Sequence, residues 1–234
     1  MEAREWKTGA AAAGDRRPCG QIKSRERVRD LAEVYTHERE VNAMLDLVPD
    51  MFPSERQPAN TDRTFLEPAC GDGNFLVEIL RRKLAYVTRR RYGRSERFEH
   101  RMLRCLASVY GIDISDDNVR ESHGRMRAVL DAHAGTHLGA GGTTPGFCSA
   151  ADTILKTNII CADTLADASE IEFVEYRPGS AGTFTRQWSS LEPRVSELNF
   201  FSFRPRRDAV PIHYSDLSDN PGPVAYGPAE RTAA

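Results

Sequence analysis

Hydrophobic residues recur at helical spacing in the stretch 37–48, at Val41, Met44, Leu45 and Val48. Intervals of three and four residues predict a helix with one apolar face. Thr36 is its expected N-cap, because a threonine side chain satisfies free N–H groups at a helix start.

Further along, short apolar runs alternate with longer helical patterns. Strands are predicted at 64–67, 108–112 and 158–161, with a fourth candidate at 171–176. Helices are predicted over 74–90, 115–133 and 150–156, together with a basic loop before the second strand and a flexible insertion at 134–146. This alternation predicts an α/β fold of the Rossmann-like type, a mostly parallel sheet with helices on both faces.

The periodic pattern covers only part of the 234 residues. The polar, aperiodic residues 1–26 are expected to be a flexible N-terminal segment, and 27–179 to be one ligand-binding domain. After Gly179 the alternation breaks down, so residues 180–234 are expected to be an irregular C-terminal extension.

Composition narrows the class of protein. Hydrophobic residues make up 40% of the chain and charged residues 28%, and no apolar run is long enough to span a membrane. The alanines at 10–13 are too few for a signal-peptide core, so a cytoplasmic location is expected. The five cysteines are odd in number and contain no Cys-x-x-Cys pair, which predicts reduced thiols and no metal site.

Charge is distributed unevenly along the chain. The net charge of −2 does not itself indicate a nucleic-acid partner, but arginine supplies nearly all the positive charge. A basic cluster near Tyr86 and Tyr92 provides candidate DNA contacts, because arginine suits phosphate and tyrosine can stack on bases. The alternative, a solvated helix end, fits equally well. The candidates are Arg89, Arg90, Arg91 and Arg94.

The glycine-rich turn after the first predicted strand is the strongest candidate site. Gly71 and Gly73 stand between a strand and a helix, where ligands of open α/β sheets bind. A dinucleotide motif would have a third glycine at the position of Leu76, and Glu67 would repel a pyrophosphate. A carboxylate there suits a ligand with a cationic amine, which favours S-adenosylmethionine over NAD.

Two further acids follow the next two predicted strands. Asp113 is placed to accept ribose hydroxyls, and Asp163 to accept from an adenine amino group. Each alone is better explained as a helix cap or a surface acid. Three acids at successive strand ends together predict a nucleoside ligand.

These motifs resemble those of N6-adenine DNA methyltransferases, including the modification subunits of restriction systems. Phe65–Leu76 resembles the cofactor motif, and 32–45 resembles the helical motif that precedes it, with His37 where proline is usual. The segments 110–113 and 161–165 are similar to the next two motifs. The resemblance implies a methyltransferase fold that binds S-adenosylmethionine through Tyr35, Thr36, Glu67, Pro68, Ala69, Cys70, Gly71, Gly73, Asn74, Phe75, Asp113, Ile114, Asp163 and Thr164.

One departure from the family concerns catalysis. The family's Asn-Pro-Pro-Tyr motif, which holds the flipped adenine, does not occur in this sequence. Tyr176, near the end of the fourth predicted strand, and Asn220, in the only Asn-Pro pair, are weak catalytic candidates. The missing acceptors predict that the chain alone methylates DNA poorly.

Three functional hypotheses follow. The first is a DNA adenine methyltransferase, or its cofactor-binding subunit, that works with DNA and a separate target-recognition, catalytic or restriction subunit. The second is a non-catalytic cofactor-binding subunit of a DNA-processing complex. The third is a methyltransferase for a small molecule or a protein.

Overall fold

The computed structural model describes residues 36–139, 142–166, 168, 171–191, 206–220 and 222. The chain divides into two compact units, Met1–Thr36 and His37–Ala234, and all elements described below belong to the second. The predicted flexible segment 1–26 lies outside the described residues.

A three-stranded parallel sheet forms the centre of this mixed α/β structure. Its strands are β1 (Phe65–Glu67), β2 (Val109–Asp113) and β3 (Ile159–Cys161), in the order β1-β2-β3. Phe65 pairs with Val109 and Gly111 pairs with Ile159. The three predicted strands and their parallel arrangement are therefore confirmed, and all three carboxyl ends lie at one edge of the sheet.

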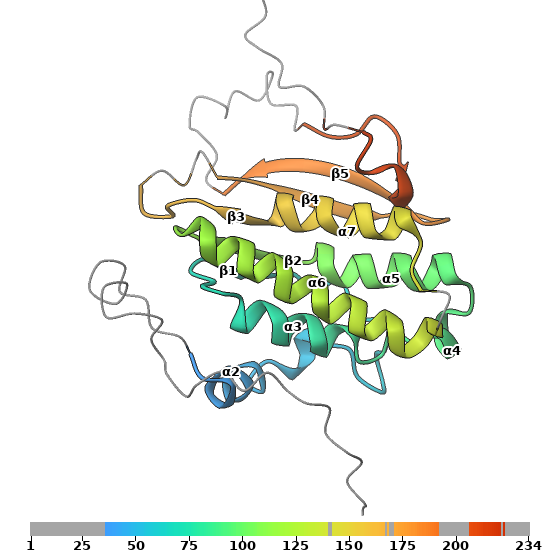
Figure 1. Cartoon of the computed structure of the whole chain (residues 1–234), viewed down its shortest axis with the longest axis horizontal. Coiled ribbons are helices and arrows are strands. Elements are labelled where there is room, and N and C mark those ends of the chain that lie inside the picture. Colours follow the sequence, from blue (N-terminus) through green and yellow to red (C-terminus); the bar gives the residue numbers. More distant parts are fainter. Residues whose placement is uncertain are drawn as a thin grey trace, which may run out of the picture. The chain divides into compact units, whose positions relative to one another are not determined.

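Helices fill the connections between these strands (Figure 1). They are α3 (Asn74–Leu84), α4 (Arg89–Tyr92), α5 (Ser95–Ala107), α6 (Asp116–Leu138) and α7 (Pro145–Asn158), whereas α2 (Glu38–Leu45) precedes β1.

The prediction of a basic loop before β2 is wrong, because α4 and α5 occupy that stretch. The buried face of α5 consists of Phe98, Met102, Cys105 and Leu106, all at most 1% exposed. Arginines interleave with these apolar positions and hide their helical spacing in the sequence.

Four other helix boundaries also differ from prediction. α6 continues to Leu138 and α7 begins at Pro145, so most of the predicted insertion at 134–146 is helical. α2 begins one residue later than expected and ends at Leu45. The side chain of His37, rather than Thr36, caps it by accepting a hydrogen bond from the Arg39 amide.

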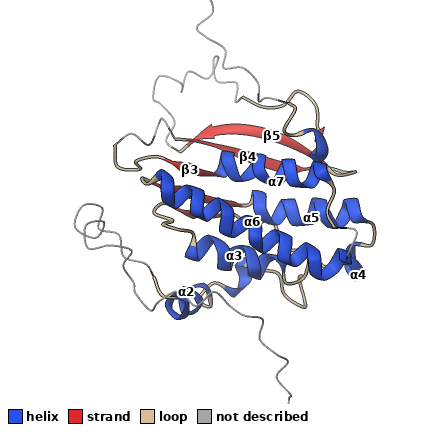
Figure 2. Ribbon diagram, in the orientation of Figure 1, coloured by secondary structure: helices blue, strands red, loops and turns tan. Residues whose placement is uncertain are grey.

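The helices that contact the parallel sheet cover one of its faces (Figures 1 and 2). Val109 and Ile159 point to that face and belong to the main core with α3, α5, α6 and α7. On the opposite face, Ile112 packs against Ile171 and Phe173, which are not helical. The prediction of helices on both faces is thus wrong for the described residues.

A second, antiparallel sheet contains β4 (Glu172–Pro178), β5 (Thr183–Ser190) and β6 (Ile212–His213). The prediction that the fourth strand joins the parallel sheet is wrong. β4 instead pairs along its whole length with β5 across a tight turn, in which Gly179 N donates to Thr183 O at 2.8 Å. A short loop brings the two strands together at a small entropic cost. The predicted domain end at 179 falls within this turn.

A buried lysine fixes the entry into β1. The Lys83 side chain is 0% exposed and donates to the carbonyls of Thr61 and Arg63 and to the Ser108 hydroxyl. Burial lowers the pKa of Lys83 to about 8. These three hydrogen bonds connect α3, which carries Lys83, to the loop before β1 and to the residue before β2. They therefore fix the position at which β1 begins.

Candidate functional site

The turn between β1 and α3 has the backbone conformation that its glycines predict. Gly71 and Gly73 have φ values of 55° and 89°, in the left-handed region that favours glycine. Cys70 N donates to Ile112 O at 2.8 Å, which ties the turn to β2. A Cβ atom on Gly73 would lie 2.8 Å from the Ser122 hydroxyl, so a side chain does not fit there.

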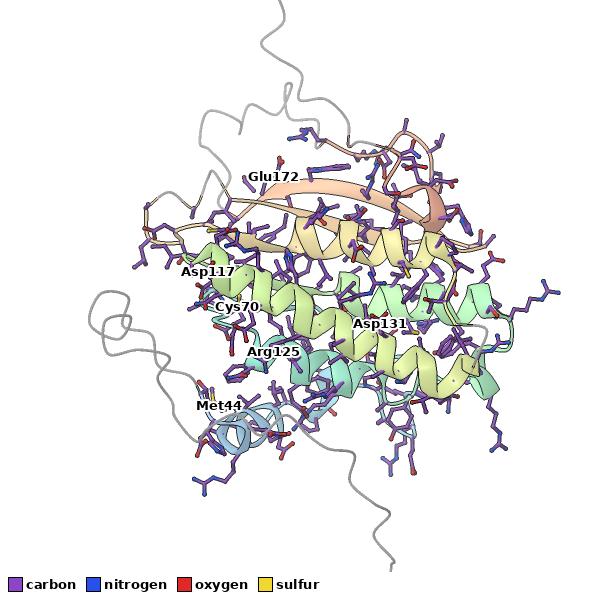
Figure 3. All side chains as sticks on the ribbon, viewed as in Figure 1. Met44, Cys70, Asp117, Arg125, Asp131 and Glu172 are labelled. Carbon is purple, nitrogen blue, oxygen red and sulfur yellow. The ribbon has the colours of Figure 1, made fainter. Side chains whose placement is uncertain are left out.

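Residues of α6 hold this turn from the helix side. Ser122 Oγ donates to Gly71 O at 3.0 Å. Arg125 donates to Asp72 O at 2.7 Å and to Asn74 Oδ1 at 2.8 Å, and its guanidinium also pairs with the Asp72 carboxylate at 2.9 Å. Figure 3 shows Cys70 in the turn and Arg125 on the neighbouring helix. The turn is therefore a fixed part of the fold.

Asp113 closes the turn from the end of β2. Its Oδ2 accepts from Gly71 N at 2.9 Å, while its Oδ1 accepts from Ser115 N at 2.9 Å and Asn118 Nδ2 at 3.1 Å. A carboxylate has about four acceptor positions, so one position on Oδ2 is left for a further donor. Asp113 thus both shapes the turn and keeps capacity to bind a ligand.

Glu67 and Asp113 share one face of the sheet. Glu67 is in register with Gly111, two residues before Asp113, and side chains alternate along a strand. With standard strand spacing, their Cα atoms are about 8 Å apart. Glu67 Oε1 accepts from Ala69 N at 3.2 Å, and its carboxylate is partly exposed at the edge of the turn.

The remaining predicted turn residues divide into exposed and packed groups. Pro68 and Ala69 are exposed, whereas Asn74 and Phe75 are half-buried at the start of α3. Phe75 packs against the main core. Cys70 is 6% exposed, and burial, followed by the charge of Asp113, raises its pKa to about 12. Its thiol therefore stays protonated and is a poor nucleophile.

The third acid lies just beyond β3. Cys161, the last residue of β3, is in register with Asp113, and Asp163 follows two residues later. Asp163 is exposed, and its Oδ1 accepts from Leu165 N at 2.9 Å. Thr164 is half-buried and Ile114 is 57% exposed. The structure therefore brings these residues to the strand edge that also holds Glu67 and Asp113.

The predicted N-terminal residues of the site are only partly described. Tyr35 lies outside the described residues, and Thr36 is half-buried. α2 packs against α3 through Arg82, which donates to Asn42 Oδ1 at 2.8 Å and pairs with Asp46 at 2.8 Å.

The two weak catalytic candidates, Tyr176 and Asn220, do not lie at the glycine turn. Tyr176 is 6% exposed, and its hydroxyl is 2.9 Å from Thr157 Oγ1. It lines a small cavity with Ser108 and Thr64, at the amino ends of β2 and β1. Asn220 is exposed, and its carbonyl accepts from Arg186 of β5. The Tyr176 ring is therefore not placed to stack on a base at the carboxyl edge, and Asn220 lies against β5 of the antiparallel sheet.

The arginine cluster is not brought to the glycine turn. α3 begins at the turn and runs for 11 residues before α4, which carries Arg89, Arg90 and Arg91. At about 1.5 Å per residue, α3 separates the two features by about 16 Å. Figure 1 shows α4 at the opposite end of the helical layer from the start of α3.

The site is acidic and contains no metal cluster among the described residues. Asp116 and Asp117, at the start of α6, add to the carboxylates at the strand ends, and Arg120 pairs with both of them. No group of three potential metal ligands occurs in the described part of the chain. The surroundings therefore suit a ligand with a positive charge.

The residues that support the turn were not predicted from the sequence. Asn118, Ser122 and Arg125 follow one another at intervals of four and three on α6, so they form a polar stripe on one helix face. That stripe was a signal available in the sequence. Gly111 was also missed, because only the packing shows that its Cβ would lie 2.8 Å from Leu76 Cδ1.

Comparison with protein-family models, with curated proteins and with solved structures finds no match to this chain. Within the described residues, every helix is too short or too polar to cross a membrane. The fold and the geometry of the strand ends are therefore the basis for a functional proposal.

Proposed function

We propose that this protein is an S-adenosylmethionine-binding methyltransferase domain of Rossmann-like type, acting on DNA adenine or serving as the cofactor-binding subunit of such an enzyme. The observation that carries the proposal is the glycine turn with Glu67, Asp113 and Asp163 at the carboxyl ends of three adjacent parallel strands. Ligands of parallel α/β sheets bind at this edge.

The residues present fit such a cofactor. Gly71 and Gly73 leave the backbone open to close approach, and Asp113 Oδ2 keeps an acceptor position for a ribose hydroxyl. Asp163 is exposed and can accept from an adenine amino group. Glu67 offers a negative charge to the amino group of the methionine part.

When bound, the cofactor supplies the methyl group, and the chain's own residues bind and orient it. The rate gain in such a transfer comes largely from holding both reactants in line. At the carboxyl edge the Asn74 side chain accepts from Arg125 and Phe75 packs against the main core, so this amide and aromatic pair is not offered to an extruded adenine. We therefore propose that a partner subunit supplies the base pocket.

A second candidate is methyl transfer to a small molecule or a protein. The strand-end surroundings are acidic, with Asp116 and Asp117 beside the three site carboxylates, and the basic cluster lies at the far end of α3. These charges favour a cationic or neutral acceptor over a polyanion. The motifs that resemble the adenine methyltransferase family support DNA as the methyl acceptor. The two candidate functions share the cofactor and differ in the molecule that receives the methyl group.

Calorimetry tests the cofactor assignment. S-adenosylmethionine and S-adenosylhomocysteine are expected to bind, and NAD is not. Asp163→Asn should weaken binding by about tenfold, the loss of roughly one charge-assisted hydrogen bond, without changing stability. The matched control is Asp131→Asn, at an exposed site toward the other end of α6, and its affinity should equal the wild type. Absence of binding by the wild-type protein would overturn the proposal.

The acceptor is tested with labelled cofactor. Tritium transfer to DNA that appears only with a neighbouring subunit supports the divided enzyme. Efficient transfer to DNA by the purified chain alone contradicts the proposed need for a partner.

A further inference from the structure

Four exposed arginines lie together on α4 and at the start of α5. They form the surface that we call the arginine face: Arg90, Arg91, Arg94 and Arg97. None of their side chains makes a hydrogen bond or an ion pair with a residue that the structure describes. Two other exposed arginines differ, since Arg120 and Arg177 each bind a carboxylate.

The local fold presents these side chains outward. Thr88 caps α4 by accepting from Arg91 N at 3.2 Å, and Gly93, with φ 71°, turns the chain into α5. Arg89 does not belong to the arginine face, because its guanidinium donates to Gly93 O. Arg89 therefore helps to hold the turn that separates the two pairs of exposed arginines.

The charge of the arginine face is not neutralised locally. Glu96 is the only carboxylate in the segment 89–97, and it lies 3.5 Å from His213 Nε2. Arg101, the next arginine of α5, stacks its guanidinium over the Tyr92 ring at 4.9 Å. Four positive charges thus face solvent in a chain whose net charge is −2.

We propose that the arginine face is a docking surface for the phosphate backbone of nucleic acid. Guanidinium groups bind phosphate oxygens through parallel hydrogen bonds, and such contacts carry no sequence preference. A regular, stiff polyanion fits four arginines fixed on two helices better than an acidic peptide, which loses more conformational entropy on binding.

This surface acts independently of the glycine turn. α3 separates the two by about 16 Å, and the turn is surrounded by acids that repel phosphate. The proposal does not rest on the cofactor assignment. It assigns the protein a contact surface for the nucleic-acid backbone that lies apart from the acidic strand ends.

The test measures binding of a short fluorescent DNA duplex by anisotropy at several salt concentrations. Four phosphate contacts account for a rise in Kd of about 150-fold between about 50 and 200 mM salt. A variant with Arg90, Arg91, Arg94 and Arg97 all changed to Ala should lose this salt-dependent contribution to binding. The slope of log Kd against log salt concentration should fall by about 3.6.

The matched control removes four exposed arginines elsewhere, through Ala at Arg39, Arg56, Arg63 and Arg177. It has the same net charge as the first variant, so it separates a local surface from overall charge. We expect its salt slope to stay close to that of the wild type. Both variants should keep wild-type cofactor affinity and circular dichroism.

Three results would overturn the proposal. The first is a wild-type protein that does not bind the duplex. The second is equal loss of DNA binding in the two variants. The third is binding of poly-glutamate as tight as that of DNA and equally lost in the first variant, which would make the surface a site for acidic peptides. A failure of cofactor binding would leave this test unaffected and would instead contradict the proposed function.

Discussion

Replacing Asp113 with Asn should both destabilise the protein and weaken cofactor binding. The Asp113 carboxylate accepts from three N–H donors, on Gly71, Ser115 and Asn118. An Asn side chain has one oxygen, which can keep the two donors now bound by Oδ1. Its NH2 group then faces the Gly71 N–H, so two donors meet and that hydrogen bond is lost.

The size of the effect follows from these three bonds. Losing one charge-assisted bond to a partly buried donor and weakening the other two costs about 3 kcal/mol. For a unit of this length, such a loss lowers Tm by about 6–12 °C. Because Gly71 is no longer held in place, we expect the Kd for S-adenosylmethionine to rise at least tenfold.

Differential scanning calorimetry and titration calorimetry measure the two effects. The control is Asp116→Asn, which removes the same charge at an exposed position in the first turn of α6. It should change Tm by less than about 2 °C, as surface substitutions usually do. If Asp113→Asn also leaves Tm within this range, the carboxylate does not hold the turn and our reasoning is refuted.

Two further predictions concern packing and pH. Gly73→Ala should reduce stability and cofactor affinity, because its Cβ would lie 2.8 Å from Ser122 Oγ at a φ of 89°; Gly124→Ala, with open space around it, should be neutral or stabilising in the same thermal melts. Equal melting temperatures for the Gly73→Ala and Gly124→Ala variants would contradict this. Burial of His100, which donates from Nε2 to Thr183 O, lowers its pKa from 6.5 to about 4. Below pH 6.5 the His100 side chain is protonated in the unfolded chain but stays neutral in the folded protein. The free energy of unfolding should therefore fall by about 3 kcal/mol between pH 6.5 and 4. Urea unfolding of His100→Gln, whose amide can keep the donor, should show a smaller pH dependence, and an unchanged one would count against the assignment.

The sequence by itself determined the elements whose patterns are local. Phe65–Glu67 is a short apolar run, and Gly71 and Gly73 stand where the backbone needs left-handed angles. The helix that follows has apolar residues at helical spacing along its buried side. Such signals depend on neighbours within a few residues, so the strand, the turn and the start of α3 could be predicted.

Interleaved charges limited that prediction in α5. Its buried residues Phe98 and Met102 alternate with arginines that reach solvent. Because a long charged side chain can lie along apolar surface with its charge in water, the sequence does not show which face of the helix is buried. Only packing against α7 and α3 reveals the buried side.

The tertiary structure alone decided how distant segments meet. Asp113 contacts Gly71 across 42 positions of sequence, and Arg125 contacts Asp72 across 53. β4 could have extended the parallel sheet, since an apolar run does not specify its partner; pairing with β5 across a short turn fixed its place. The distance between the arginine face and the glycine turn likewise follows from the direction of α3. Contacts of this kind depend on three-dimensional packing, which the local pattern of residue types does not encode.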